Sequence, residues 1–523
     1  MEIPADVQEN VHGAPFPGDS KPVRLAAIAA GLLFSVSYFV SCAIVSARSS
    51  LTTDEIFVTW TLRAFPGRLL EALKSGVDSL PPGYYLLLEA VTRVMGLNAL
   101  ALRLPSIVAF YIFLLSIFWL VRKHVSLPVA VLAMALPCVT GALAAAVLAR
   151  PYAMVAACFG IAGVLWTRSS AKPASLRRAM ALTIVLAIAI GLHFYAVLLV
   201  AVLGLAELVR SARDREFRWA NWAALAVAGF SVLLWWPVIG PIYRLTHASI
   251  HAAGYYAKPT LGALFAKLLE LVVGQRSLAV LLALVCLALG LLRQCQPPSG
   301  PARNRPDAVD DSTALSNLDI LAFAALTLPF TTFIFALAVT GSFNTRHFYA
   351  AVLGISLLAA RALRQFRYAN GVSFFVLLLI VATFANNTLR GAPGEDPRIA
   401  VAERSPEHLP VVLGDASDFF ELRESAPPGL RDRLVFVGMP AGFSSPDPEP
   451  EMVAWIWKGI LKDMPVFHAE DWFAGAPRFY VLCTGGNREG LTDWLIHHAT
   501  VTVARRESGM LLLEVKEPHL EAR

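Results

Sequence analysis

The chain has 523 residues, of which 56% are hydrophobic and only 16% are charged, and its mean hydropathy is +0.59. Soluble proteins carry about 25% charged residues, so this composition excludes an ordinary soluble enzyme and indicates a polytopic membrane protein. The net charge of +6 comes without a basic stretch rich in aromatic residues, which argues against a nucleic-acid partner. The six cysteines are scattered and form neither a disulfide framework nor a CxxC metal motif.

Apolar runs predict an all-α transmembrane domain over residues 25–390, after a polar tail at 1–24. A helix needs about 20 apolar residues to cross a bilayer. On that scale we expect about eleven transmembrane helices, of which the first is an uncleaved anchor. The expected spans are 25–46, 103–121, 127–147, 152–166, 177–191, 193–209, 219–240, 276–293, 318–340, 348–361 and 370–388.

Lysine and arginine mark every second loop between these spans. Because cytoplasmic loops are enriched in these residues, we expect the N-terminal tail and the Pro-rich linker at 294–317 to lie in the cytoplasm. The long first loop, 47–102, is then expected outside the cytoplasm. Short amphipathic helices at 81–96 and 260–273 are expected to lie on the outer surface of the membrane.

The character of the chain changes at about residue 395, and residues 395–523 predict a small extracytoplasmic α/β domain. Expected strands alternate with helices, which favours a partly parallel sheet. The strands are 409–414, 433–438, 478–484, 501–506 and 510–515, and the helices are 449–464 and 488–499. The TGGN sequence at 484–487 is too short for a phosphate-binding glycine motif, so we expect this domain to dock an acceptor or a partner.

Polar and ionisable residues gather at the outer ends of the expected spans. Such groups are costly in or near hydrocarbon unless they face a wet cavity or a partner, so we expect them to form one site. They are Asp54 and Glu55 in the first outer loop, Asp78 and Tyr84 later in that loop, Arg150 and Tyr152, His193 and Tyr195, and Arg346, His347 and Tyr349.

The motifs that carry these residues resemble those of a known family of membrane enzymes. They are TTDE (52–55), PPGYYLLL (81–88), LRLPS (102–106), ARPYAM (149–154), HFYAVLL (193–199) and RHFYAAVLG (346–354). In order and spacing, residues 25–365 resemble the integral-membrane glycosyltransferases of the GT-C fold, in particular the bacterial protein O-mannosyltransferase and aminoarabinose-transferase-like group. The resemblance implies a multi-pass protein of the bacterial cytoplasmic (inner) membrane.

The resemblance also implies an activity. In similar proteins a sugar is transferred from a polyprenyl phosphate, and an acidic residue of the first outer loop deprotonates the acceptor. Asp54 matches that position, and a carboxylate within hydrogen-bond reach of a hydroxyl can take its proton. Arg150 and Arg346 are the expected phosphate ligands, because guanidinium groups bind phosphate in a bidentate manner. The substrate-binding set comprises these arginines and Glu55, Asp78, Tyr84, Tyr152, His193, Tyr195, His347 and Tyr349.

Structural alternatives remain open for several of these residues. Thr52 and Glu55 fit a capping box at the start of a helix, and the arginines could extend to lipid headgroups. His193 is compatible with a structural hydrogen bond. His247 and His251 have a spacing that a metal site could use, but no HExxH motif accompanies them, so ordinary loop histidines are the favoured interpretation.

One departure from the family bears on cofactors. Many relatives have His-Pro-Pro where this chain has Leu80, Pro81 and Pro82. Asp78 could supply the missing polar group, or could bind a divalent cation together with Asp54. The sequence therefore requires no cofactor, and it leaves a divalent cation open.

The sequence thus predicts a glycosyltransferase that acts on an envelope lipid, glycan or protein, lipopolysaccharide among them, at the outer face of the membrane. A secondary transporter or flippase for a lipid-linked or anionic substrate is the alternative. Transporters place charges near the midplane of repeated halves, whereas here the charges lie at one face and no repeat is found. A third reading, a catalytically inactive scaffold, requires that Asp54 be dispensable.

Overall fold

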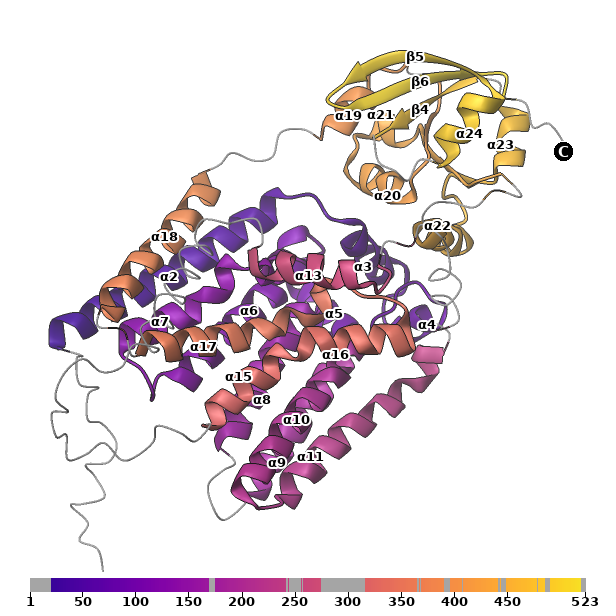
Figure 1. Ribbon diagram of the computed structural model, residues 1–523. Coiled ribbons are helices and arrows are strands. Elements are labelled where there is room, and N and C mark those ends of the chain that lie inside the picture. The colour runs from indigo at the N-terminus through magenta and orange to yellow at the C-terminus, as the bar shows by residue number, and fades with distance from the viewer. Residues whose placement is uncertain are drawn as a thin grey trace, which may run out of the picture.

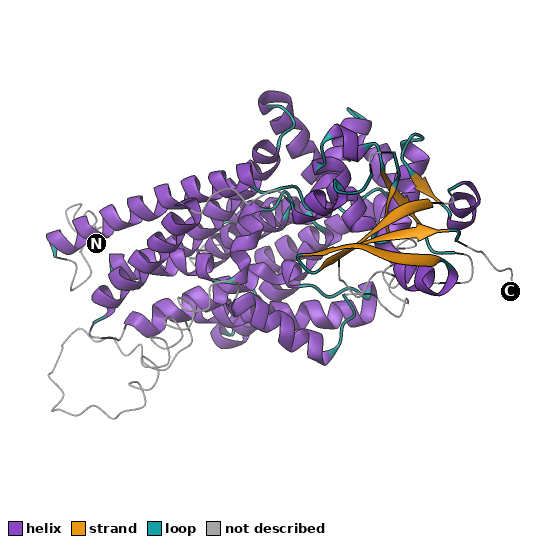
Figure 2. Ribbon diagram, turned by 90° about the horizontal axis from the view of Figure 1, so that it is seen from above, coloured by secondary structure: helices purple, strands orange, loops and turns teal. Residues whose placement is uncertain are grey.

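The protein consists of a long helical bundle with a mixed α/β domain at one end (Figure 1). The computed structural model describes residues 20–168, 175–240, 243, 255, 257–273, 316–364, 366, 368–389, 396–406, 408–440, 443, 448–476, 478–484 and 490–518. Figure 2 shows the strands confined to one end of the molecule, with helices making up the rest.

The bundle contains these helices, in chain order: α2 (Lys21–Arg48), α3 (Thr53–Ala64), α4 (Leu69–Lys74), α5 (Pro82–Met95), α6 (Ala99–Val121), α7 (Leu127–Ala135), η2 (Leu136–Val139), η3 (Gly141–Val147), α8 (Tyr152–Arg168), α9 (Leu176–Leu192), η4 (Phe194–Ala196), α10 (Val197–Asp214), α11 (Trp219–Phe230), η5 (Ser231–Trp235), α13 (Leu261–Val273), α15 (Asn317–Leu326), α16 (Leu328–Phe335), η6 (Ala336–Thr340), η7 (Thr345–Ala351), α17 (Val352–Arg364) and α18 (Ala369–Leu389).

Within the described residues, six helical segments are long and apolar enough to cross a membrane: Lys21–Arg48, Ala99–Val121, Phe194–Asp214, Trp219–Gly240, Asn317–Thr340 and Ala369–Leu389. Helices occupy the other expected spans as well, except 276–293, which lies outside the described residues. The amphipathic helices expected at 81–96 and 260–273 form as α5 and α13.

The expected span at 127–147 is not one straight helix. Its two halves, Leu127–Val139 and Gly141–Val147, meet at 80°. The side chain of Thr140 accepts a hydrogen bond from the Ala142 N–H and so starts a new helical turn. A Cβ atom at Gly141 would collide with the carbonyl oxygen of Glu270, so only glycine allows the close contact with α13. The apolar composition of this run concealed the break.

A buried ion pair between Glu55 and Arg103 ties the start of α3 to the bundle. Glu55 Oε1 and Oε2 lie 2.7 and 2.6 Å from Nε and Nη2 of Arg103, and neither side chain is more than 2% exposed. Arg103 also donates to the carbonyls of Ser46, Ser49 and Ser50, which a helix end leaves without intrahelical partners. One guanidinium therefore fixes the end of α2, the start of α3 and its own helix, α6.

The Glu55 carboxylate accepts three further hydrogen bonds, one of them from the Thr52 hydroxyl at 3.2 Å. Its Oε2 accepts from the Thr52 N–H at 2.9 Å, which confirms the predicted capping box, and its Oε1 accepts from the Ala149 N–H at 2.7 Å. Ala149 directly precedes Arg150, and α8 begins two residues later, at Tyr152. The ion pair therefore also fixes where α8 begins.

The C-terminal domain has the partly parallel sheet that was expected. Its strands are β1 (Val411–Leu413), β2 (Leu434–Val437), β3 (Val466–Phe467), β4 (Arg478–Cys483), β5 (Thr500–Glu507) and β6 (Met510–Lys516), in the order β3-β2-β1-β4-β6-β5. The first four pair in parallel, and β6 pairs antiparallel with β4 and β5. The helices are α19 (Pro397–Ala402), α20 (Ala416–Ser425), α21 (Pro428–Arg431), α22 (Pro448–Ile460), α23 (Ala469–Gly475) and α24 (Gly490–His498). The two-residue strand β3 was not predicted, because it is too short to show a pattern.

Helix α3 belongs to two hydrophobic cores. Val58 and Leu62 pack in the core of the bundle. Phe57 and Trp60, on another face, belong to the core of the C-terminal domain, where their rings lie 4.9 and 5.5 Å from that of Phe420 on α20. The C-terminal domain is therefore packed directly against the first loop segment of the bundle.

We predict that Arg103→Met destabilises the protein by about 3–5 kcal/mol, because it leaves the Glu55 carboxylate buried without its cation. Thermal unfolding of the detergent-solubilised protein measures the effect. Arg93→Met is the matched control: Arg93 pairs with Glu89, but its side chain is 71% exposed. Equal melting temperatures of the two variants would contradict a structural role for the buried pair.

Candidate active site

Asp54 lies in the first turn of α3 and is held by two arginines from distant parts of the chain. Its Oδ1 is 2.9 Å from Nη2 of Arg150, and its Oδ2 is 2.5 Å from Nη1 of Arg346. Burial alone would raise the pKa of the Asp54 carboxyl, but the charges and hydrogen bonds of Arg150 and Arg346 outweigh it and hold the pKa below its usual range. Asp54 is therefore ionised at neutral pH.

Arg150 is the fixed member of this cluster. It lies two residues before Tyr152, the first residue of α8, its side chain is only 6% exposed, and its Nη1 lies 2.5 Å from Oδ2 of Asp78. Asp78 is itself held, because it accepts hydrogen bonds from the Tyr85 hydroxyl and the Ser79 N–H. The guanidinium of Arg150 thus bridges two carboxylates and has little freedom to move.

Arg346 is the more accessible arginine. It lies in η7, where the side chain of Asn344 caps the helix and accepts from the Arg346 N–H. Its side chain is 26% exposed, and its guanidinium lies 5.8 Å from the centre of the Tyr152 ring. The side chain therefore contacts Asp54 and also reaches an adjoining pocket.

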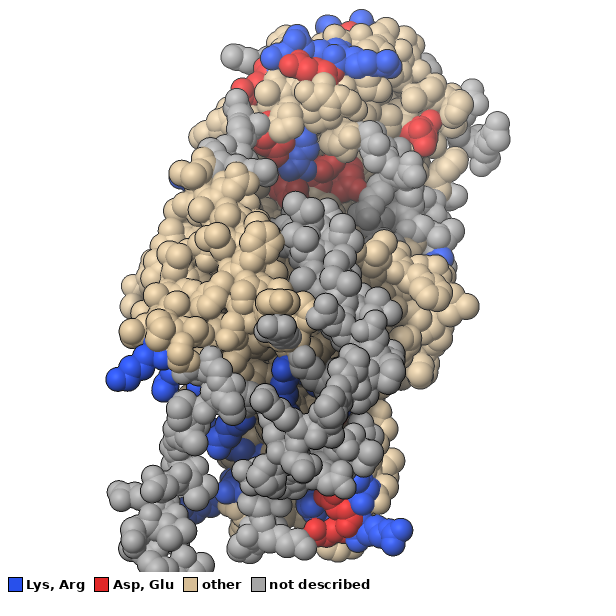
Figure 3. Space-filling view, turned by 60° about the vertical axis from the view of Figure 1, so that its left-hand side comes forward, with Lys and Arg blue, Asp and Glu red and all other residues tan. Residues whose placement is uncertain are grey.

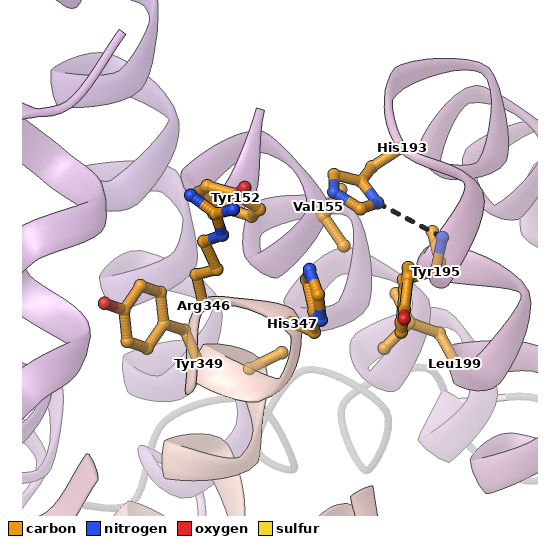
Figure 4. A pocket seen from close by; sticks show the side chains of 10 residues that line it. Tyr152, Val155, His193, Tyr195, Leu199, Arg346, His347 and Tyr349 are labelled. Atoms are coloured by element: carbon orange, nitrogen blue, oxygen red, sulfur yellow. Dashed lines mark hydrogen bonds between the residues drawn. The ribbon is translucent and has the colours of Figure 1, made fainter. Parts of the chain in front are cut away.

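That pocket is lined by aromatic and histidine side chains (Figure 4). Its polar and aromatic lining residues are Tyr152 on α8, His193 and Tyr195 at the α9–α10 junction, and Arg346, His347 and Tyr349 on η7. Its free volume is about 10 Å³, which is room for about one water molecule. A sugar or phosphate would therefore have to displace side chains to enter.

The lining residues hold one another by ring contacts. The His347 ring stacks on that of Tyr195 with centroids 3.9 Å apart, and the Tyr152 ring lies 5.3 Å from that of His193. His193 Nδ1 accepts a hydrogen bond from the Tyr195 N–H, which is the dashed line in Figure 4. His193 therefore has the structural bond considered from the sequence, and it also faces the pocket.

Two tyrosine hydroxyls of the predicted set differ in their environment. The Tyr195 hydroxyl hydrogen-bonds with Thr340, the last residue of the Asn317–Thr340 span, and with Ser342 just after it. The Tyr84 side chain is completely buried, and its hydroxyl has no hydrogen-bond partner among the described residues. The Tyr195 hydroxyl thus has a structural role, whereas the Tyr84 hydroxyl could still donate a hydrogen bond to a ligand.

The structure brings most of the predicted residues together in two adjoining groups. We call Asp54, Asp78, Arg150 and Arg346 the charged cluster. We call the adjoining pocket, lined by Tyr152, His193, Tyr195, Arg346, His347 and Tyr349, the aromatic pocket. Glu55 differs from the expectation that it contacts substrate: it is 0% exposed, and its carboxylate is occupied by Arg103 and backbone N–H groups. His247 and His251 lie outside the described residues.

A divalent cation does not fit between Asp54 and Asp78 in this arrangement. The guanidinium of Arg150 lies between the two carboxylates and binds both. Among the described residues, no group of three or more His, Cys, Asp or Glu side chains is placed to hold a metal ion. We therefore derive no step through a metal.

Three residues near the site had no role in the sequence prediction. Arg103 lies in the LRLPS motif, and a cation in the first turn of an apolar span was the signal that could have identified it. Tyr85 holds Asp78 through its hydroxyl. Glu421 of the C-terminal domain binds Thr53, the neighbour of Asp54. No sequence pattern connects Glu421 with the first loop.

Comparison with known proteins identifies the fold. The sequence matches no protein-family model and no curated protein. Among solved structures it is similar to ArnT from Cupriavidus metallidurans in the apo state, with a TM-score of 0.55 and 14% identity over 94% of this chain and 98% of that chain. ArnT bound to undecaprenyl phosphate gives a TM-score of 0.55 at 13% identity, over 92% and 97% of the two chains.

An oligosaccharyltransferase from Archaeoglobus fulgidus, in complex with Zn and sulfate, gives a TM-score of 0.39 at 11% identity, over 77% of this chain and 62% of that chain. The ArnT match runs through both the bundle and the C-terminal domain. With its apolar helices, this multi-pass membrane protein therefore has the ArnT-like GT-C fold that the sequence motifs predicted.

Proposed function

We propose that the protein is a membrane glycosyltransferase that moves a sugar from a polyprenyl-phosphate donor to an envelope acceptor. The observation that carries the proposal is the position of Asp54, a half-buried carboxylate between Arg150 and Arg346 beside the aromatic pocket. The likeness to ArnT, one structure of which is bound to undecaprenyl phosphate, supports a lipid phosphate as the leaving group.

The charged cluster has groups suited to each part of this reaction. The acceptor hydroxyl gives its proton to Asp54 as its oxygen bonds to the anomeric carbon. The bond from that carbon to the phosphate oxygen breaks, and the lipid phosphate leaves with the electron pair. Arg346 and Arg150 stabilise its negative charge through charge-assisted hydrogen bonds. The side chains of the aromatic pocket have to move apart to receive the sugar, because the free volume of the pocket is about 10 Å³.

Asp54 is a weak base while guanidinium groups bind both of its oxygens, because they lower its pKa. The Arg150 side chain is 6% exposed and also binds Asp78, whereas that of Arg346 is 26% exposed, so Arg346 is the arginine that a donor phosphate can reach. A donor phosphate that binds Arg346 frees Oδ2 of Asp54 for the acceptor hydroxyl. Asp54 then becomes a stronger base when the donor has bound, which couples proton transfer from the acceptor to the presence of the donor.

The arrangement of charge and apolar surface favours a site outside the cytoplasm. Figure 3 shows Lys and Arg side chains at the end of the bundle away from the C-terminal domain, and cytoplasmic ends are enriched in such residues. Leu261, Phe265 and Leu269 on α13 are each more than 60% exposed, as expected for a helix that lies against lipid. We therefore place the C-terminal domain on the outer face of a bacterial inner membrane.

We predict that Asp54→Asn lowers transfer by about 10²–10⁴-fold, because the amide cannot accept the acceptor proton. The assay offers the purified protein radiolabelled polyprenyl-phosphate sugars together with envelope extract. Asp432→Asn, an exposed aspartate of the C-terminal domain, is the control. Undiminished transfer by Asp54→Asn would remove the proposed base and favour the scaffold reading.

The pH dependence of kcat/KM should change in Arg346→Gln. In the wild type Arg150 and Arg346 lower the pKa of Asp54, so the acid limb of kcat/KM that this group causes lies at low pH. In Arg346→Gln one of the two guanidinium groups that stabilise the Asp54 carboxylate is lost. Burial then opposes its ionisation more effectively, and the pKa of Asp54 rises. The acid limb of kcat/KM should therefore move to higher pH in Arg346→Gln but not in Arg93→Gln. An unshifted limb would argue against Asp54 as the titrating base.

The proposed orientation gives a direct topological prediction. A reporter enzyme that is active only outside the cytoplasm should be active when fused after residue 390 or at the C-terminus. A fusion within the linker at 294–317 should be inactive with the same reporter. The reverse pattern would invert the loop assignment and place Asp54 on the cytoplasmic side.

A further inference from the structure

The start of α3 is capped from another part of the chain. Glu421 on α20 accepts two hydrogen bonds at Oε1, from the Thr53 N–H at 3.2 Å and from the Thr53 hydroxyl at 3.0 Å. The first N–H groups of a helix have no intrahelical partner. A carboxylate at this end also interacts favourably with the helix dipole. Thr53 directly precedes Asp54, so the cap acts on the turn that carries the proposed base.

Glu421 is itself fixed within the C-terminal domain. Its Oε2 lies 3.0 Å from Nη2 of Arg398, which also binds Asp396 and Asp418. Asp418 in turn accepts from the hydroxyl of Thr484, the residue after β4. Glu421 therefore presents its free oxygen to Thr53 from a rigid network and not from a mobile surface side chain.

A second carboxylate holds the other end of the same helix. Glu424, one turn beyond Glu421 on α20, accepts from Nε1 of Trp60 at 3.0 Å and from Arg63 at 3.1 Å. The Trp60 ring also meets that of Trp457 at 5.4 Å. Glu424 thus contributes to the same interface, but it binds α3 about two turns beyond Asp54 and not at the turn that carries Asp54.

We propose that Glu421 is a positioning residue for the reaction, and that the C-terminal domain holds the catalytic helix in register through it. This inference rests on the function proposed above. Without Glu421 the Thr53 N–H and hydroxyl lose their partner, and the residue before Asp54 is no longer tied to the C-terminal domain, although Arg103 still holds Glu55, the residue after Asp54. A displacement of about 1 Å at a reacting group can lower a rate by about 10²-fold. The C-terminal domain is then part of the catalytic apparatus.

The test compares kcat and KM in the full-length protein. Glu421→Ala should lower kcat about 10–100-fold and leave the KM for the donor nearly unchanged, because the arginines remain. Glu421→Gln should restore most of kcat, since the amide oxygen still accepts from Thr53. Glu424→Ala should lower the melting temperature without a comparable loss of kcat. A Glu421→Ala variant with kcat within about twofold of wild type would overturn the inference.

A measurement without substrate separates positioning from a general loss of stability. Hydrogen exchange of the peptide that spans residues 51–58 should be faster in Glu421→Ala than in wild type. It should be unchanged in Glu514→Ala, which removes an exposed ion pair with Arg478 in the same domain. Equal exchange in wild type and Glu421→Ala overturns the inference. Asp54→Asn in the same kinetic assay distinguishes the two proposals: if it retains full transfer, the proposed function fails first.

Discussion

The fully buried ion pair between Glu55 and Arg103 is the constraint on which the site depends. It joins the end of the first span, the start of α3, the start of α6 and the residue before Arg150. A buried pair of this kind gains little over apolar residues in stability, but loss of one partner is costly. Its consequence here is geometric. Asp54 is the neighbour of Glu55, and Arg150 is the neighbour of Ala149, whose N–H donates to Glu55. The pair therefore brings together two residues that are about 100 residues apart in the chain.

The two adjacent acids of the TTDE motif therefore have separate tasks. Successive residues of a helix point about 100° apart. Glu55 faces the interior and closes the capping box, whereas Asp54 faces the charged cluster. The structural alternative and the catalytic one, which seemed to compete for the same motif, apply to different members of it.

The charged cluster has no net charge, but its two arginines differ in how deeply they are buried. Two carboxylates and two guanidinium groups give no net charge, yet Arg150 is enclosed by both acids and Arg346 binds only at the accessible edge. An anionic ligand would thus reach Arg346 more readily than Arg150. The C-terminal domain lies on the other side of the same helix, so α3 is where the bundle, the cluster and the soluble domain meet.

The sequence alone determined the membrane character, most helices of the bundle, the mixed sheet and the set of polar residues near Asp54. It did not predict helices α19, α20, α21 and α23 of the C-terminal domain. Hydropathy, strand patterns and the spacing within motifs are local properties, so they can be recognised in the sequence without knowledge of the fold. Tertiary structure alone decided the bend at residues 139–141, the burial of Glu55 and the cap from Glu421. Each of these depends on a contact between distant segments, 368 residues apart for Thr53 and Glu421. A side chain that is satisfied by so remote a partner leaves no periodic signal, which is why only the folded chain reveals it.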